Sequence, residues 1–186
     1  MQVSKQDIDK LLSQSEPRLL NSVLFNLAHS YSRVSDMALD AISSTQDADF
    51  AAPAIMCKSF SIELLLKFFI IISHPNIQTK TDLDSSKVNL RGHQYSKLYD
   101  KIDLIYKTKI AQSFNCISGQ QVNEITFKNV LIDIGDDPFV FWRYIYEKDG
   151  KDGRFHHLDL VLFNNVLHAM GKAAEAERKR IVDETK

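Results

Sequence analysis

Residues 59–72 read SFSIELLLKFFIII, and they are the strongest structural signal in the chain. As a helix, the stretch is apolar on every face except one stripe, where Ser59, Glu63 and Lys67 recur every fourth residue. Such a helix has to be buried nearly all round. Its carboxylate and its amine then need partners, because an unpaired buried charge is very costly. Glu63 and Lys67 are therefore the first candidates for a functional site.

The composition is that of an ordinary globular domain. Of the 186 residues, 44% are hydrophobic and 25% are charged, and this length suits a single domain, residues 1–186, with one core. The formal net charge is -1, so the global balance favours neither nucleic acid nor an anionic membrane as a partner. A nucleic-acid-binding function would need a local basic patch.

Cellular location is indicated by what the chain lacks. The N-terminal sequence MQVSKQD has no apolar core of a signal peptide, and the longest apolar run, residues 68–72, is far shorter than the ~20 residues of a membrane span. Cys57 and Cys116 are far apart and have no metal-ligand spacing. We therefore expect a cytoplasmic protein with free thiols and no membrane association.

Apolar periodicity predicts an all-α fold. Glycine and proline are scarce and fall between periodic segments, which favours helices over short strands. From Pro17 to about Ser43, apolar residues recur at steps of three and four and predict one long amphipathic helix. The next helix carries residues 59–72 and is expected to end before Pro75.

The following segments are expected to alternate between helix and loop. Residues 76–91 are polar and aperiodic and predict a loop that is either mobile or functional. A helix is expected to open at Gly92-His93 and to run toward Phe114, and a further one to end at Gly135 as a left-handed cap. The last helix begins near His157, and residues 172–186 predict a polar helical tail that projects into solvent.

Residues 139–147, FVFWRYIYE, are aromatic on all sides. The period alone does not separate a short buried helix from a strand here, and we interpret the segment as a helix. Asp137 as the cap and Pro138 at the first helical position mark its start.

Three short motifs together resemble the HEPN (higher eukaryote and prokaryote nucleotide-binding) superfamily, over roughly residues 50–170. The first is the central helix with Ser59, Glu63, Leu64 and Lys67, the second is Gly92-His93 followed by Leu98, and the third is Trp142-Arg143-Tyr144-x-Tyr146-Glu147. The resemblance implies an up-and-down bundle of about five to six helices, frequent homodimers, and a place in bacterial defence, toxin–antitoxin and stress systems.

The active ribonucleases of that superfamily carry an arginine followed after four to six residues by a histidine. This chain has no such pair, since only Arg154 is close to histidines, and His156 and His157 follow it too early. Metal-free RNA cleavage of that type is therefore not expected, and no residue is assigned a catalytic role.

A ligand or partner pocket is predicted from five residues: Glu63, Lys67, His93, Arg143 and Glu147. The simpler alternative is that Glu63 and Lys67 form only a structural pair one turn apart. Arg143 lies between Trp142 and Tyr144 and must reach solvent or an acid, so a contact with Glu63 or Glu147 is predicted.

No metal site and no cofactor are expected. His156, His157 and Asp159 lack a matching ligand one turn away, and helix capping explains the acidic corner of Asp133, Asp136 and Asp137.

The leading hypothesis is a non-catalytic HEPN-like binding module, an immunity, antitoxin or regulatory component whose partner is a toxin or defence protein. One alternative is a ribonuclease or nucleotide-modifying enzyme with a rearranged site made from His93, Arg143, Glu63 and Lys67, acting on RNA or a nucleotide. A small-molecule sensor that binds in the bundle core is a third hypothesis.

Overall fold

The computed structural model describes residues 19–143 and 159–184, and every regular element in these ranges is a helix. The predicted all-α class is confirmed. In chain order the elements are α2 (Leu20–Thr45), the 3-10 helix η1 (Ala48–Phe50), α3 (Ala51–Ile72), α4 (Lys80–Ser85), α5 (Tyr95–Asp100), α6 (Leu104–Ser118), α7 (Thr126–Asp133), α8 (Pro138–Arg143) and α9 (Leu160–Glu184). None of the described helices combines the length and apolarity that crossing a membrane requires.

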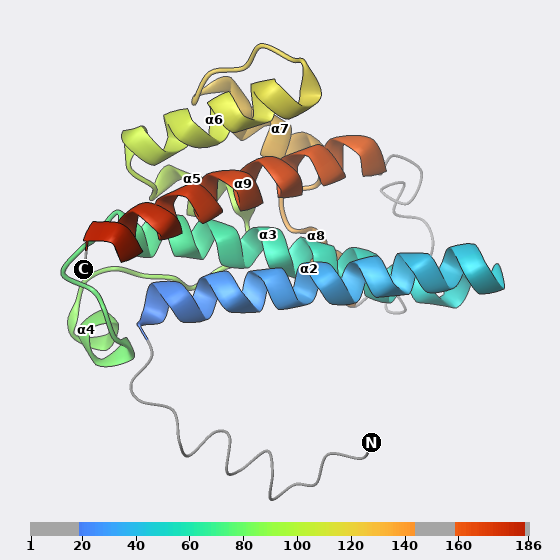
Figure 1. Cartoon of the computed structure of the whole chain (residues 1–186), viewed down its shortest axis with the longest axis horizontal. Coiled ribbons are helices and arrows are strands. Elements are labelled where there is room, and N and C mark those ends of the chain that lie inside the picture. The colour runs from blue at the N-terminus through green and yellow to red at the C-terminus, as the bar shows by residue number, and fades with distance from the viewer. Residues whose placement is uncertain (1–18, 144–158, 185–186) are drawn as a thin grey trace, which may run out of the picture.

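Helix α3 is the centre of the bundle, as the apolar stretch predicts. It packs against α2, α5, α8 and α9, and Ile62, Leu66, Phe69 and Ile70 are fully buried. Figure 1 shows α2, α3 and α9 side by side, with α6 on the side of α9 that faces away from α2. Since α3 has neighbours on all sides, its charged side chains have to find partners inside the molecule.

Helix α2 covers one side of α3 with an amphipathic face. Leu24, Phe25 and Ala28 are buried against the core, and the helix ends at Thr45. Gln46 then adopts a left-handed conformation, with φ of 57°, and its N–H binds the carbonyl of Ile42. The end predicted near Ser43 is confirmed to within two residues, while the start predicted at Pro17 lies outside the described residues.

The prediction of a polar loop over residues 76–91 is wrong in its middle, where α4 forms. Thr79 and Asp82 make a capping box: the Thr79 hydroxyl accepts from the Asp82 N–H at 3.2 Å, and the Asp82 carboxylate accepts from the Thr79 N–H at 2.7 Å. Leu83 is the only apolar residue in α4, so the helix has no periodicity to reveal it.

The single helix predicted from Gly92-His93 toward Phe114 is also wrong, because the chain forms α5 and α6 with a break between them. Helix α5 starts only at Tyr95, whose N–H binds the carbonyl of Asp136 at 2.7 Å. Asp103 then adopts an extended conformation and donates its N–H to the Ser73 hydroxyl at 3.0 Å. This break and helix α4 raise the number of helices above the five to six expected.

The C-terminal segment is helical as predicted, but from Lys172 to Glu184 it does not project into solvent. It continues α9 and packs against α6, with Ala173, Ala174 and Glu177 buried. Small alanine side chains allow the close approach, and Lys109 of α6 pairs with Glu177. A sequence that is mostly polar can therefore be packed when its few small residues share one face.

Two turn predictions near the later helices are confirmed. Gly135 follows α7 with a φ of 89°, a left-handed conformation that favours glycine. Helix α8 begins at Pro138, so the aromatic segment is helical as far as Arg143. The rest of that segment, residues 144–147, and the start predicted near His157 lie outside the described residues.

Candidate functional site

Glu63 is the centre of the candidate site. Its side chain is fully buried, and Lys67, one turn further along α3, donates to Glu63 Oε1 at 2.6 Å. Only 16% of the Lys67 side chain is exposed. The pair is therefore shielded from solvent and held by the regular spacing of one helix.

His93 supplies the second partner of this carboxylate. Its Nδ1 lies 2.9 Å from Glu63 Oε2, so both carboxylate oxygens are occupied. A carboxylate only accepts, which assigns the proton of a neutral ring to Nδ1 and leaves Nε2 as the free nitrogen. The side chain of His93 is 48% exposed. Glu63 thus orients a histidine whose ring is open to solvent.

Tyr95 closes the site on its inner side. Its hydroxyl donates to the backbone carbonyl of Ser59 at 2.6 Å, and its side chain is fully buried. Burial, together with the negative charge of Glu63, raises the pKa of Tyr95 well above its usual value. Tyr95 therefore stays a neutral donor, and with His93 it anchors the start of α5 to α3.

Asp136 fixes the same end of α5 from the other side. Its carboxylate accepts from the N–H of Ser96 at 2.6 Å and from the Ser96 hydroxyl at 2.9 Å. Of the three aspartates in the acidic corner predicted to serve helix capping, Asp136 is therefore confirmed as a cap, and the helix that it caps, α5, comes earlier in the chain.

The remaining two predicted pocket residues are not placed beside Glu63 by the structure. Glu147 and the side chain of Arg143 lie outside what the structure describes, so the contact of Arg143 with Glu63 or Glu147 stays a prediction. Helix α8 does reach the site through Phe139, whose ring centroid lies 5.8 Å from that of His93 and 4.6 Å from that of Phe60.

An open groove begins where His93 reaches the surface. It has a volume of about 680 Å³ and is formed by residues 80–93 together with Lys67. Its charged lining residues are Lys67, Lys80, Asp84, Lys87 and Arg91, and His93 lines the same groove. We call it the 80–93 groove.

The charge of the 80–93 groove is positive. Lys80 pairs with Asp84 at 3.1 Å, and Lys67 is engaged by Glu63. Lys87 and Arg91 are exposed, and within the described ranges neither forms an ion pair. Residues 76–91 are predicted from the sequence to be mobile or functional, but neither Lys87 nor Arg91 stands out among them, although Arg91 is only two positions before His93.

No metal site emerges from the part of the chain that the structure describes. There, no group of three or more His, Cys, Asp and Glu side chains is arranged to hold an ion. His156 and His157 are outside that part.

Comparison of the chain with protein-family models, with curated proteins and with solved structures gives no match in any of the three. The resemblance to the HEPN superfamily therefore rests on the short motifs alone.

Proposed function

We propose that this protein is a non-catalytic binding module that recognises an acidic surface of a partner protein through the 80–93 groove. The observation that carries the proposal is a pair of exposed cations, Lys87 and Arg91, which line an open groove and form no ion pair with any described residue. Carboxylates of a partner would pair with these two cations, which would increase both the affinity and the rate of association.

The chemistry of Glu63 supports binding rather than turnover. A carboxylate that acts as a base has to reach the proton it removes. Glu63 is fully buried, and its two oxygens are held by Lys67 and His93. It serves as an anchor that fixes the edge of the groove.

The biological setting of the proposal follows from the resemblance to the HEPN superfamily. In that setting the module is an immunity, antitoxin or regulatory component, and its partner is a toxin or another defence protein. A homodimer and a cytoplasmic location belong to the same proposal.

A second candidate function is favoured by one observation, the geometry of His93. Glu63 binds Nδ1 of His93 and leaves Nε2 free on a ring that is open to solvent. A histidine that acts as a general base is oriented by a carboxylate in the same way. Beside the cations of the 80–93 groove, such a base would suit a ribonuclease or a nucleotide-modifying enzyme with a rearranged site.

Affinity capture from a lysate of the source organism separates the two functions. The tagged wild type is compared with two variants. Lys87→Glu/Arg91→Glu reverses the charge of two residues of the 80–93 groove, and the control, Arg33→Glu/Lys179→Glu, makes the same charge change elsewhere. We expect one acidic protein to be retained by the wild type and the control and to be lost from the groove variant. Recovery of RNA that is cut by the wild type and spared by His93→Ala supports the enzyme instead.

A further inference from the structure

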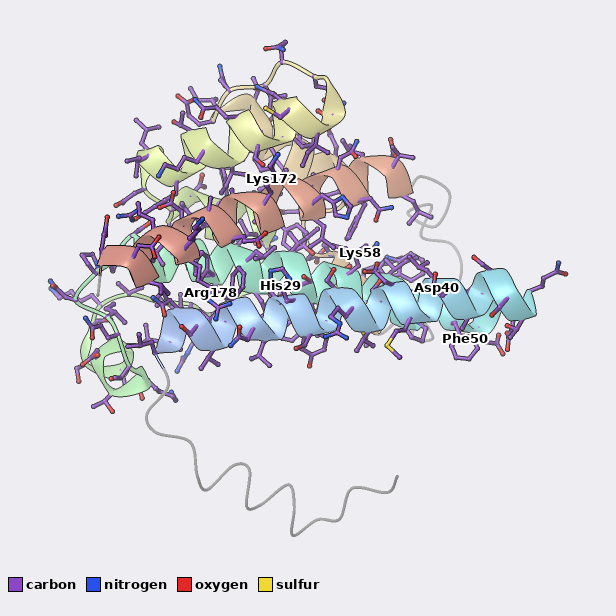
Figure 2. The ribbon with its side chains drawn as sticks, viewed as in Figure 1. His29, Asp40, Phe50, Lys58, Lys172 and Arg178 are labelled. Atoms are coloured by element: carbon purple, nitrogen blue, oxygen red, sulfur yellow. The ribbon has the colours of Figure 1, made fainter. Side chains whose placement is uncertain are left out.

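A second groove lies between α2 and α9, on the face of α3 opposite Glu63. Its floor contains Ser61 and Leu65, each two residues from Glu63 and so about 160° away around the helix. His29 of α2 and Arg178 of α9 lie between these two helices in Figure 2. We call it the α2–α9 groove, and it shares no lining residue with the 80–93 groove.

The α2–α9 groove has an inner and an outer part, which share His29 and Glu175. The inner part has a volume of about 250 Å³. Leu65, Leu167 and Gly171 belong to the apolar part of its wall, and the polar or charged part is formed by His29, Ser32, Ser61, His168, Lys172 and Glu175. The outer part has a volume of about 690 Å³ and carries Arg33, Arg178 and Lys179. A small chamber with a partly apolar wall therefore adjoins a wider basic vestibule.

Gly171 keeps the inner part open. It lies in the interior of α9, where glycine is less favourable than alanine by roughly 0.5–1 kcal/mol. A Cβ at this position would meet no atom within 4 Å, so packing does not require the glycine. Its missing side chain leaves room in the wall of the chamber, and a bound group would use that room.

The cations that line the α2–α9 groove form no ion pair with any described residue. Within residues 19–143 and 159–184, Arg33, Lys172, Arg178 and Lys179 form no ion pair, and Glu175 is the only acid that lines the groove. Arg180, by contrast, is bound by Glu177 and Glu184.

Arg178 is also held in position by an aromatic ring. Its guanidinium lies over the ring of Phe25, 4.6 Å from the centroid. A preorganised arginine with lysine and arginine neighbours is suited to an anion that carries more than one charge, such as a phosphate group.

We propose that the α2–α9 groove binds a small phosphorylated ligand. The phosphate group lies on Arg33, Arg178 and Lys179, and a compact apolar body enters the chamber beside Gly171. This site is independent of the partner surface proposed for the 80–93 groove, and either can be wrong without the other.

Two glycine amides make the proposal testable by nuclear magnetic resonance. The full chain, labelled with ¹⁵N, is titrated with inorganic phosphate and with phenyl phosphate. We expect saturable shifts of the Gly171 amide and little change at Gly92, which lines the 80–93 groove. Phenyl phosphate should bind about tenfold more tightly than inorganic phosphate, because its ring buries apolar surface in the chamber.

Substitutions test separately how the outer and the inner part of the α2–α9 groove contribute to binding. Arg33→Gln/Lys179→Gln should weaken both probes about tenfold or more, whereas Lys87→Gln/Arg91→Gln, with the same charge change, should leave both unchanged. Gly171→Leu fills the chamber and should remove the advantage of phenyl phosphate, and Gly171→Ala, which fits without a clash, should retain part of it.

Three results would each overturn the proposal. These are the absence of saturable shifts at Gly171 with either probe, equal affinity for the two probes in the wild type, and equal weakening by the two charge variants. Circular dichroism of each variant shows whether it is folded. If Gly171→Leu does not fold, two measurements still test the proposal. These are the affinities of the two probes for the wild type and the effects of the two charge variants.

Discussion

Glu63 Oε2 lies 2.9 Å from His93 Nδ1, and this contact joins the buried centre of α3 to the surface segment that precedes α5. The same carboxylate binds Lys67 through its other oxygen. One fully buried acid thus holds two of the side chains that line the 80–93 groove.

Glu63→Gln should lower the free energy of unfolding by about 2–3 kcal/mol, because two charge-assisted hydrogen bonds are lost and Lys67 is left without an acid. Urea denaturation measures the change. The exposed Glu175→Gln is the control and should shift stability by less than about 0.5 kcal/mol. Equal effects of the two substitutions would contradict the buried pair.

The tautomer of His93 is a second prediction. With the ring neutral, the proton should reside on Nδ1 and exchange slowly, because Glu63 Oε2 accepts it. Ring ¹⁵N shifts of the labelled protein report the tautomer directly. In Glu63→Gln the preference for Nδ1 should weaken, and a proton on Nε2 in the wild type would refute the contact.

How much of this arrangement can be predicted from the sequence depends on how local its causes are. The central position of α3 follows from its apolar residues, and the spacing of Glu63 and Lys67 already pairs them on one helix turn. Helix α4 is set by a capping box that apolar periodicity does not show, and the start of α5 depends on Asp136, which is distant in sequence.

The groove residues illustrate the same limit. His93 is a candidate through its position at an expected helix start and through the family resemblance, but its contact with Glu63 spans 30 positions of sequence. Lys87, Arg91 and Gly171 carry no pattern of their own. They become noticeable only when folding brings them to the walls of a groove.

Two buried serines should respond in opposite directions to replacement by alanine. The hydroxyl of Ser35 has no hydrogen-bond partner among the described residues, whereas that of Ser61 donates to the carbonyl of Ala28 at 2.8 Å. Ser35→Ala should therefore raise stability by about 1 kcal/mol, and Ser61→Ala should lower it by about 1 kcal/mol. Thermal unfolding of the pair measures the contrast, and loss of stability in both variants would contradict it.

Glu177 should make the stability of the protein depend on pH in the acid range. Burial by itself raises the pKa of this carboxyl, but hydrogen bonds from Lys109 and Arg180 outweigh burial and hold the pKa below its usual value of 4.5. A lowered pKa in the folded state means that the stabilisation is complete above that usual value and is lost as pH falls through the folded-state pKa.

Urea denaturation between neutral and acid pH tests the role of Glu177. Glu177→Gln should be less stable than the wild type at neutral pH, and the difference should shrink as the wild-type carboxyl is protonated. A difference that stays constant down to the lowest pH would show that Glu177 does not titrate in this way.

The most direct test of the binding function uses the captured partner in purified form. Its affinity is measured for the wild type, for Lys87→Glu/Arg91→Glu and for Arg33→Glu/Lys179→Glu at two salt concentrations. The account predicts at least about tenfold weaker binding for the first variant only, with the wild-type affinity falling as salt rises. Equal weakening by both variants, or no weakening by either, would contradict it.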